Sequence, residues 1–254
     1  MMDDLKRKLT DFYNKFNEEK RLDRRHGQVE LNTSLHFIRR YLRENDRIID
    51  IGAGRGRYAF ALRDEGYDVT AVEYVRPNIG VIRARDPGLK LVEADATDLS
   101  MFADDSFDIG IMFGPMYHLP DQKLRLAALK EAVRICRRYL FVAYLMNDYS
   151  VIQYAFIEDH YRDIKDKLDQ DYHIRDKDAI FFQVRIDDID ELDREAGLKT
   201  VCRFAQDGPS DYIRGTLNRM DEETFSAFMD YHLRTCERKE LLGASSHVVD
   251  IIEL

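Results

Sequence analysis

The chain has 254 residues, of which 44% are hydrophobic and 34% are charged, and its formal net charge is −9. This length and hydrophobic content suit one α/β domain with a full core and an insertion or small cap. The negative charge disfavours a nucleic-acid partner, because contacts to phosphates need a concentrated basic surface. The basic pairs Arg24–Arg25 and Arg137–Arg138 are short and mixed with acids, as on solvated helix faces.

The three cysteines, Cys136, Cys202 and Cys236, are far apart and form no CxxC pair. This pattern predicts neither a disulfide framework nor a zinc site. Residues 1–20 are charged throughout, unlike a secretory signal, and no apolar run approaches the ~20 residues of a membrane span. We therefore expect a cytoplasmic protein without a membrane partner. The sequence indicates no oligomeric state.

Residues 3–20 and 28–43 are predicted to form amphipathic helices, since apolar residues in the second recur at helical spacing. Strands and helices then alternate. Apolar strands are predicted at 47–52, 68–75, 89–95, 107–114 and 138–146. Helices are predicted at 55–67, ending near Gly66, and at 77–85 and 121–137. This alternation predicts a parallel sheet with helices on both faces.

The pattern changes after residue 146. Residues 147–178 are charged and aromatic, which favours a helical insertion packed on the main domain. The remaining chain predicts strands at 179–186, 198–206 and 245–254, with helices at 187–197 and 221–241. No internal repeat or low-complexity linker is present.

The segment RIIDIGAGRGRYAF, residues 47–60, places Gly52, Gly54 and Gly56 between a strand and a helix. Such a turn lets a ligand approach bare backbone at the positive end of a helix. A dinucleotide site would need a glycine where Arg57 stands, which disfavours NAD or FAD. No G-K-[ST] follows, which excludes a Walker loop.

Three acids follow successive strands of the predicted sheet. Asp50 ends the first strand, Glu73 the second and Asp95 the third. Since ligands bind at the carboxyl ends of parallel strands, the three acids are expected to line one crevice. Glu73 can accept from both hydroxyls of a ribose, and Asp95 with the N–H of Ala96 suits the edge of an adenine. Asp50 is costly to bury unless it faces the crevice or bonds the glycine loop.

Five segments carry a resemblance: DIGAGRGRYAFAL, VTAVEYV, VEADATDLS, FDIGIMFGPMYHL and ELLGASSHVVDIIEL. Together they resemble the class I S-adenosylmethionine-dependent methyltransferases. The resemblance covers residues 30–146 and 186–254. GPMYHL, residues 114–119, is similar to the GPLYHL found after the fourth strand in a bacterial subgroup with small or unassigned substrates. The motifs are specific for fold and cofactor, and not for substrate.

The resemblance implies a doubly wound, Rossmann-like sheet of seven mostly parallel strands, the last one antiparallel. It implies one methyltransferase domain over residues 1–254, with a helical lid at 1–43 and a cap at 147–180. The glycines would face the amino acid moiety of S-adenosylmethionine, and Phe113 and Gly114 its methionine part. In the lid, Tyr13, Arg24 and Arg25 are candidates, an arginine meeting the cofactor carboxylate bidentately. The expected cofactor-binding residues are Tyr13, Arg25, Asp50, Gly52, Ala53, Gly54, Gly56, Glu73, Tyr74, Asp95, Ala96, Phe113 and Gly114.

Methyl transfer from a sulfonium needs placement of the acceptor, exclusion of water and, for some acceptors, removal of a proton. No metal is required, and the seven histidines show no close ligand spacing, so no metal site is expected. Tyr117 and His118 are the catalytic candidates. His118 is interpreted as a general base or a helix cap, and Tyr117 as a substrate contact or core packing.

Aromatic residues recur at roughly helical spacing in the insertion, at Tyr149, Tyr154, Phe156, His160 and Tyr161. They either line a substrate pocket as a lid or form the packed face of a cap helix.

The sequence thus predicts an enzyme that transfers a methyl group from S-adenosylmethionine to a small-molecule acceptor by in-line displacement. A non-catalytic, cofactor-binding regulatory or scaffold protein remains the alternative, since no unambiguous base is present. An NAD-dependent oxidoreductase rests only on the shared sheet. The acceptor atom cannot be read from the sequence.

Overall fold

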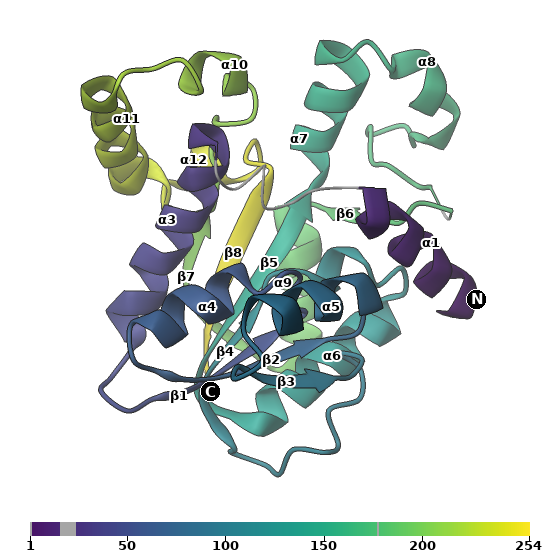
Figure 1. The fold of residues 1–254 in the computed structure, drawn as a ribbon. Helices are drawn as coiled ribbons and strands as arrows, with labels where there is room; N and C mark the ends of the chain where they lie inside the picture. Colours follow the sequence, from purple (N-terminus) through teal and green to yellow (C-terminus); the bar gives the residue numbers. More distant parts are fainter. Residues whose placement is uncertain (1, 16–23, 177) are drawn as a thin grey trace.

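A computed structural model describes residues 2–15, 24–176 and 178–254. Its centre is one sheet in the order β3-β2-β1-β4-β5-β8-β7 (Figure 1). The strands are β1 (Arg47–Ile51), β2 (Asp68–Glu73), β3 (Lys90–Glu93), β4 (Phe107–Met112), β5 (Cys136–Met146), β7 (Lys199–Ala205) and β8 (His247–Glu253). All strands from β1 to β5 pair in parallel, whereas β8 is antiparallel to both β5 and β7. The predicted doubly wound sheet with an antiparallel last strand is confirmed.

The sheet has an eighth, very short strand, β6 (Gln183–Val184). The sequence predicted a strand over residues 179–186, and only these two residues pair. The reason lies in β5, whose pairing with β4 stops at Val142 although the strand continues to Met146. The edge of β5 that extends beyond β4 is therefore short, and its last two residues, Leu145 and Met146, pair with β6.

Helices cover both faces of the sheet. The main ones are α3 (Arg25–Tyr41), α4 (Arg57–Asp64), α5 (Arg76–Arg85), α6 (Gln122–Ile135), α9 (Ile186–Ala196) and α11 (Glu222–Thr235). The chain winds outward from β1 to β3 and then the opposite way from β4 to β5. Because such crossovers are right-handed, α4 and α5 lie on one face and α6 on the other.

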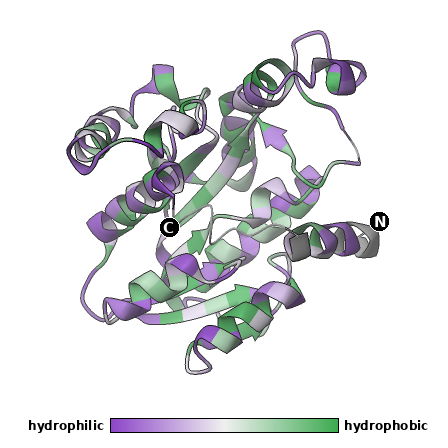
Figure 2. Ribbon diagram, turned by 45° about the horizontal axis from the view of Figure 1, so that its top comes forward, coloured by the Kyte–Doolittle hydropathy of each residue, from purple (hydrophilic) through white to green (hydrophobic). Residues whose placement is uncertain are grey.

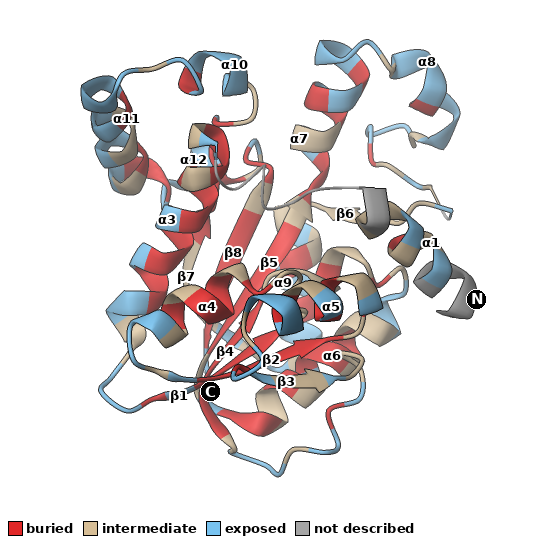
Figure 3. Ribbon diagram, viewed as in Figure 1, coloured by how far each residue is buried: buried red, intermediate tan, exposed pale blue. Residues whose placement is uncertain are grey.

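The strands between the helix layers are buried, and this burial explains their continuous apolar runs. Every residue of β4 is buried, as are Ile48, Ile49 and Ile51 of β1. Figure 2 shows hydrophobic residues along the sheet and hydrophilic ones on the outer helices, and Figure 3 shows burial following the same division.

The insertion is helical, as predicted, but in short pieces. It comprises α7 (Asn147–Ser150), the π-helical η2 (Val151–Ile157), α8 (Tyr161–Ile164) and the 3₁₀ turn η3 (Lys165–Lys167). Elsewhere, the N-terminal helix is α1 (Met2–Lys15), and the short helical segments are η1 (Pro115–Tyr117), α10 (Arg214–Leu217) and α12 (Lys239–Leu242). The predicted end of the first helix, residues 16–20, lies outside the described residues. Within the described ranges, no helix is long and apolar enough to cross a membrane.

The edge of the sheet contains a buried charge cluster. Arg203 on β7 donates to Asp250 on β8, with 2.7 Å between Nη2 and Oδ2, and Asp250 is fully buried. Asp193 of α9 lies beside them and accepts from Thr200 at 2.8 Å. Burial, together with the charge of Asp250, raises the pKa of the Asp193 carboxyl. The Arg203 guanidinium therefore compensates acidic groups that water cannot reach.

We predict that Arg203→Met lowers the free energy of unfolding by about 3–5 kcal/mol, because it leaves Asp250 as an uncompensated buried charge. Urea unfolding followed by circular dichroism measures the change. Arg39→Met is the control, since Arg39 pairs with Glu65 on the surface and such a pair contributes about 0–1 kcal/mol. Equal losses in the two variants would contradict the role of Arg203.

Candidate functional site

A cleft of about 1260 Å³, including its open mouth, lies at the carboxyl ends of β1, β2 and β4. It brings together most of the site residues predicted from the sequence. Those that line it are Tyr13, Asp50, Gly52, Ala53, Gly54, Glu73, Tyr74, Asp95, Ala96, Phe113, Gly114, Tyr117 and His118. Gly56 and Arg25 do not line it.

The glycine turn after β1 has a left-handed backbone at Gly52, Gly54 and Gly56, with φ of 73°, 57° and 81°. The three glycines nevertheless serve different purposes. A Cβ on Gly52 would stand 2.7 Å from Cδ of Pro115, so this glycine lets the loop after β4 pack on the turn. A Cβ on Gly56 would stand 2.9 Å from the Phe60 ring. Gly56 therefore begins α4 and is not a wall of the cleft, which corrects its expected place.

Glu73 connects the turn to the next strand. Its Oε2 accepts from the backbone N–H of Gly54 at 2.6 Å. Its Oε1 accepts from the N–H groups of Tyr74 and Val75, at 2.8 and 2.7 Å. The carboxylate is thus fixed at the cleft wall by three backbone donors.

Asp50 and Asp95 are each held by local donors. Asp50 is 2% exposed, and its Oδ2 accepts from the N–H of Ala59 in the first turns of α4, at 3.1 Å. The positive end of the helix thus helps to offset the cost of burying this carboxylate. Asp95 accepts at Oδ1 from the N–H and the hydroxyl of Thr97, at 3.0 and 2.8 Å. This turn keeps Asp95 at the cleft beyond β3.

The loop after β4 is held against the turn. The Tyr117 hydroxyl donates to the carbonyl of Phe113 at 2.5 Å, which closes the short η1 helix on itself. A Cβ on Gly114 would stand 3.2 Å from the carbonyl oxygen of Gly52, so a glycine permits this close approach. Tyr117 and Phe113 are consequently fixed on the same side of the cleft.

Both ring nitrogens of His118 have partners. Nδ1 lies 2.7 Å from the carbonyl of Ile180 and must donate to it, so Nε2 accepts from the Tyr13 hydroxyl at 2.9 Å. Burial lowers the pKa of His118 to about 4, although the hydrogen bond to Ile180 acts in the opposite direction. The imidazole is therefore neutral at pH 7. The expected helix cap is wrong, because Asp121 caps α6 by accepting from Lys123.

The predicted lid residues separate in the structure. Tyr13 of α1 lines the cleft, and its hydroxyl is hydrogen-bonded to His118. Arg25 begins α3, whose first turn faces α11, and it donates to Glu222 at 3.2 Å with its guanidinium 5.3 Å from the Phe225 ring centre. Arg25 is thus a contact between helices and not a cleft residue. The arginines that do line the cleft are Arg55, Arg57 and Arg85.

Sequence reasoning used Arg57 only to disfavour a dinucleotide and did not propose it as a site residue. Its position directly after the glycine turn, as the first residue of α4, was an available signal. Glu30 of α3 also lines the cleft and was missed, because nothing in its own segment distinguishes it from a surface acid.

The aromatic residues of the insertion do not line the cleft. Tyr154 stacks on His160 and Phe156 on Tyr161, with ring centres 4.5 and 5.8 Å apart. The packed face of this segment is instead aliphatic, built from Val151, Ala155 and Ile164. The pocket-lining prediction is therefore wrong. The packed-face prediction holds for Tyr149, which packs against the main core, and fails for the exposed Tyr154, Phe156 and Tyr161.

A doubly wound sheet with an antiparallel β8 between β5 and β7, carrying a ligand cleft at a glycine turn, has the class I methyltransferase fold. Residues 49–140 match the methyltransferase domain family. That match and the fold imply S-adenosylmethionine as the cofactor.

Among curated proteins, the chain is 35% identical over 96 residues to the demethylmenaquinone methyltransferase of Beutenbergia cavernae, covering 37% of this chain and 38% of that protein. It is 31% identical over 90 residues to the cypemycin N-terminal methyltransferase of a Streptomyces species, covering 34% and 36%. The chain thus matches less than two fifths of the length of these relatives.

Solved structures resemble the whole fold. An S-adenosylmethionine-dependent methyltransferase from Methanosarcina mazei gives a TM-score of 0.54 at 20% identity, covering 85% of this chain and 96% of that one. One from Archaeoglobus fulgidus gives 0.56 at 18% identity, covering 89% and 94%. At these identities the likeness concerns the fold alone.

The lowered pKa of His118 predicts a pH dependence. The unfolded chain binds a proton near pH 6.5 and the folded chain only near pH 4, so stability falls as pH decreases through that window. Between pH 7 and 4.5, wild type is expected to lose about 2 kcal/mol more than His118→Asn, which has no titrating group. Urea unfolding at the two pH values measures this difference. Parallel losses in both proteins would contradict it.

Proposed function

We propose that this protein is an enzyme that transfers the methyl group of S-adenosylmethionine to a small-molecule acceptor. One observation carries the proposal: the glycine turn, Glu73, Asp95 and Phe113 meet at one cleft, within the matched methyltransferase domain. The cofactor supplies the electrophilic methyl group and its own leaving group.

The proposed cofactor contacts follow the order of the strands. The turn at Gly54 brings backbone close to the amino acid moiety, and Glu73, at the cleft wall after β2, is the proposed partner of the ribose hydroxyls. Asp95 and Ala96 hold the adenine at the end of β3. Arg57, beside the positive end of α4, replaces Arg25 as the candidate partner for the cofactor carboxylate.

The acceptor side of the cleft is proposed to lie at Tyr117 and His118. Their hydrogen bonds to Phe113 and Ile180 hold them in place, so they can position an acceptor in line with the methyl group and exclude water. Leu9 and Tyr13 of α1 line the same cleft, which supports a covering role for the N-terminal helix. His118 acts in this scheme as a neutral hydrogen-bonding group.

The acceptor class rests on the relatives' names. One name refers to demethylmenaquinone and another to the N-terminus of cypemycin, and both matches are confined to little more than a third of this chain. Of the residues proposed for the acceptor side, Tyr117 and His118 lie within the matched region, whereas Leu9 and Tyr13 of α1 lie outside it. We therefore commit to a small-molecule acceptor and to no particular nucleophilic atom.

A non-catalytic cofactor-binding protein is the second candidate, favoured by the engagement of both His118 nitrogens. Incubation with S-adenosylmethionine labelled in its methyl group, together with a fractionated metabolite pool, separates the two. Label transferred to any acceptor supports the enzyme. Tight binding of S-adenosylhomocysteine without transfer supports the second candidate.

Glu73→Ala is expected to weaken S-adenosylhomocysteine binding by about 1–3 kcal/mol, since it removes acceptors for the ribose. Isothermal titration calorimetry measures the affinity. Glu93→Ala is the matched control, because Glu93 pairs with Glu73 across β2 and β3 but does not line the cleft. Unchanged affinity in Glu73→Ala would remove this residue from the cofactor site.

Gly54→Val is expected to weaken the same binding more than Glu73→Ala does. Its side chain would occupy the approach path, and φ of 57° is strained for a β-branched residue. Gly80→Val serves as the control, because a Cβ at Gly80 meets nothing within 4 Å. Normal affinity in a folded Gly54→Val protein would refute the proposed cradle.

A further inference from the structure

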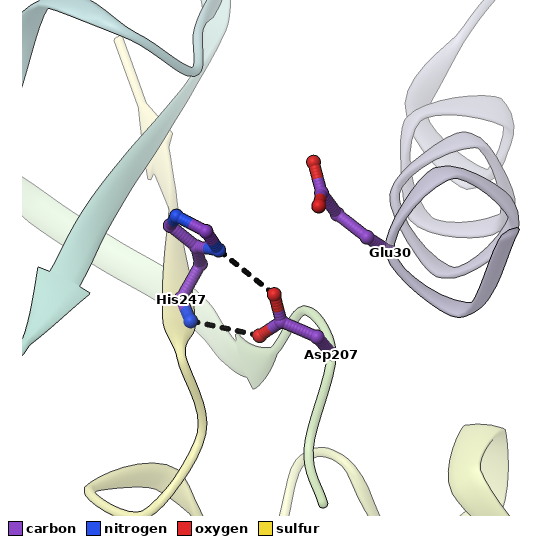
Figure 4. A group of neighbouring side chains, drawn as sticks. All are labelled: Glu30, Asp207 and His247. Atoms are coloured by element: carbon purple, nitrogen blue, oxygen red, sulfur yellow. Dashed lines mark hydrogen bonds and ion pairs between the residues drawn. The ribbon is translucent and has the colours of Figure 1, made fainter. Parts of the chain in front are cut away.

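Three potential metal ligands from distant parts of the chain converge beside the cleft. Glu30 comes from α3, Asp207 follows β7, and His247 begins β8. Figure 4 shows the three side chains directed toward one another. Each offers a ligand atom, and these atoms all lie within 4.8 Å of one another.

The group is well shielded from water. Glu30 is 7% exposed and Asp207 is 2% exposed, while His247 is partly buried. In such surroundings the attraction between a bound cation and carboxylate ligands is only weakly screened by water. Buried acids of this kind are typically paired or coordinate a metal.

The spacing of Asp207 and His247 suits neighbouring ligands on one ion. Nδ1 of His247 lies 2.8 Å from Oδ2 of Asp207. Two adjacent ligands at ~2.1 Å from an octahedral cation stand about 3 Å apart, so a cation can take the place of the shared proton. The third ligand atom, a carboxylate oxygen of Glu30, lies within 4.8 Å of the other two, so a small shift of the side chain completes the set.

Asp207 is also oriented as a ligating carboxylate would be. Its Oδ1 accepts from the Ser245 hydroxyl at 2.9 Å and from the backbone N–H of His247 at 2.7 Å. These donors fix the carboxylate plane and leave Oδ2 directed at His247. Hydrogen bonds of this type commonly hold metal ligands in position.

We propose that Glu30, Asp207 and His247 form a binding site for one divalent cation. One imidazole with two carboxylates favours Mn²⁺ or Zn²⁺ over Mg²⁺, which prefers oxygen ligands alone. Glu30 lines the cleft, and the His247 ring centre lies 5.6 Å from that of Tyr117. The ion would therefore stand at the acceptor side of the cleft, where it can bind an oxygen or nitrogen of a ligand.

The test is calorimetric titration of the full chain, stripped of metal with a chelator that is then removed, with MnCl₂ and ZnSO₄. We expect one ion per chain, and at least tenfold weaker binding by Glu30→Gln. Glu44→Gln makes the same chemical change at an exposed position and is expected to bind as wild type does. The proposal is overturned if neither Mn²⁺ nor Zn²⁺ binds at one ion per chain. It is also overturned if Glu30→Gln binds with the same affinity as wild type.

A second pair of measurements locates the ion and guards against misfolding. Pulsed electron paramagnetic resonance of bound Mn²⁺ is expected to show coupling to an imidazole nitrogen that His247→Gln abolishes. Asp207→Asn keeps the side-chain shape and is expected to weaken Mn²⁺ binding at least tenfold with an unchanged circular dichroism spectrum. Retained nitrogen coupling in folded His247→Gln overturns the site. The site is independent of the proposed function, which S-adenosylhomocysteine binding by the metal-free protein tests separately.

Discussion

The arrangement of the cleft depends on the carboxylate of Glu73. It accepts hydrogen bonds from the backbone of two loops, the one that follows β1 and the one that follows β2. It holds Gly54 of the first turn and Tyr74 and Val75 of the second. Without this carboxylate, the two loops would have to satisfy three N–H donors separately. Because the strands are parallel and their carboxyl ends meet, one side chain can connect both loops, and the remaining cleft residues take their places around it.

The loop after β4 meets the same centre from the opposite side. Pro115 packs against Gly52, which leaves no room for a side chain there, and the carbonyl of Gly52 closely approaches Gly114. His118 then extends this contact outward, joining Ile180 and Tyr13 through its two ring nitrogens. The cleft is thus bounded by the N-terminal helix and by the loops that follow the strands, and Ile180, from the region after the insertion, holds His118 from behind.

The spacing of apolar residues and the turn residues between them predicted the strands, the helices and their order. An apolar run of strand length between turn residues indicates a strand without reference to the rest of the chain. The same reasoning failed where a segment's role depends on its neighbours. The strand at 179–186 shrank to two residues because β5 has only a short free edge. Arg25 was expected at the cofactor and lies against Glu222 and Phe225, because the packing of α3 on α11 decides which way its first turn faces.

The site residues divide in the same way, into those that could be predicted from their place in a segment and those that depend on packing. Asp50, Glu73 and Asp95 were recognised because each ends a strand, and parallel strands end at one edge whatever else the chain does. Tyr154, Phe156 and Tyr161 of the insertion were misjudged, since helical spacing groups residues on one face of a helix without showing whether that face is buried. The roles of the individual glycines became separable only once the atoms around Gly52 and Gly56 were placed.

The sequence by itself determined the class of fold, the edge of the sheet at which a ligand binds and the turn that receives it. These features are encoded in short segments, whose residue spacing is set by local backbone geometry. Only the tertiary structure brought Glu30, Asp207 and His247 together and engaged both nitrogens of His118. Contacts between distant segments depend on how helices pack and how strands pair, and no local pattern records that outcome.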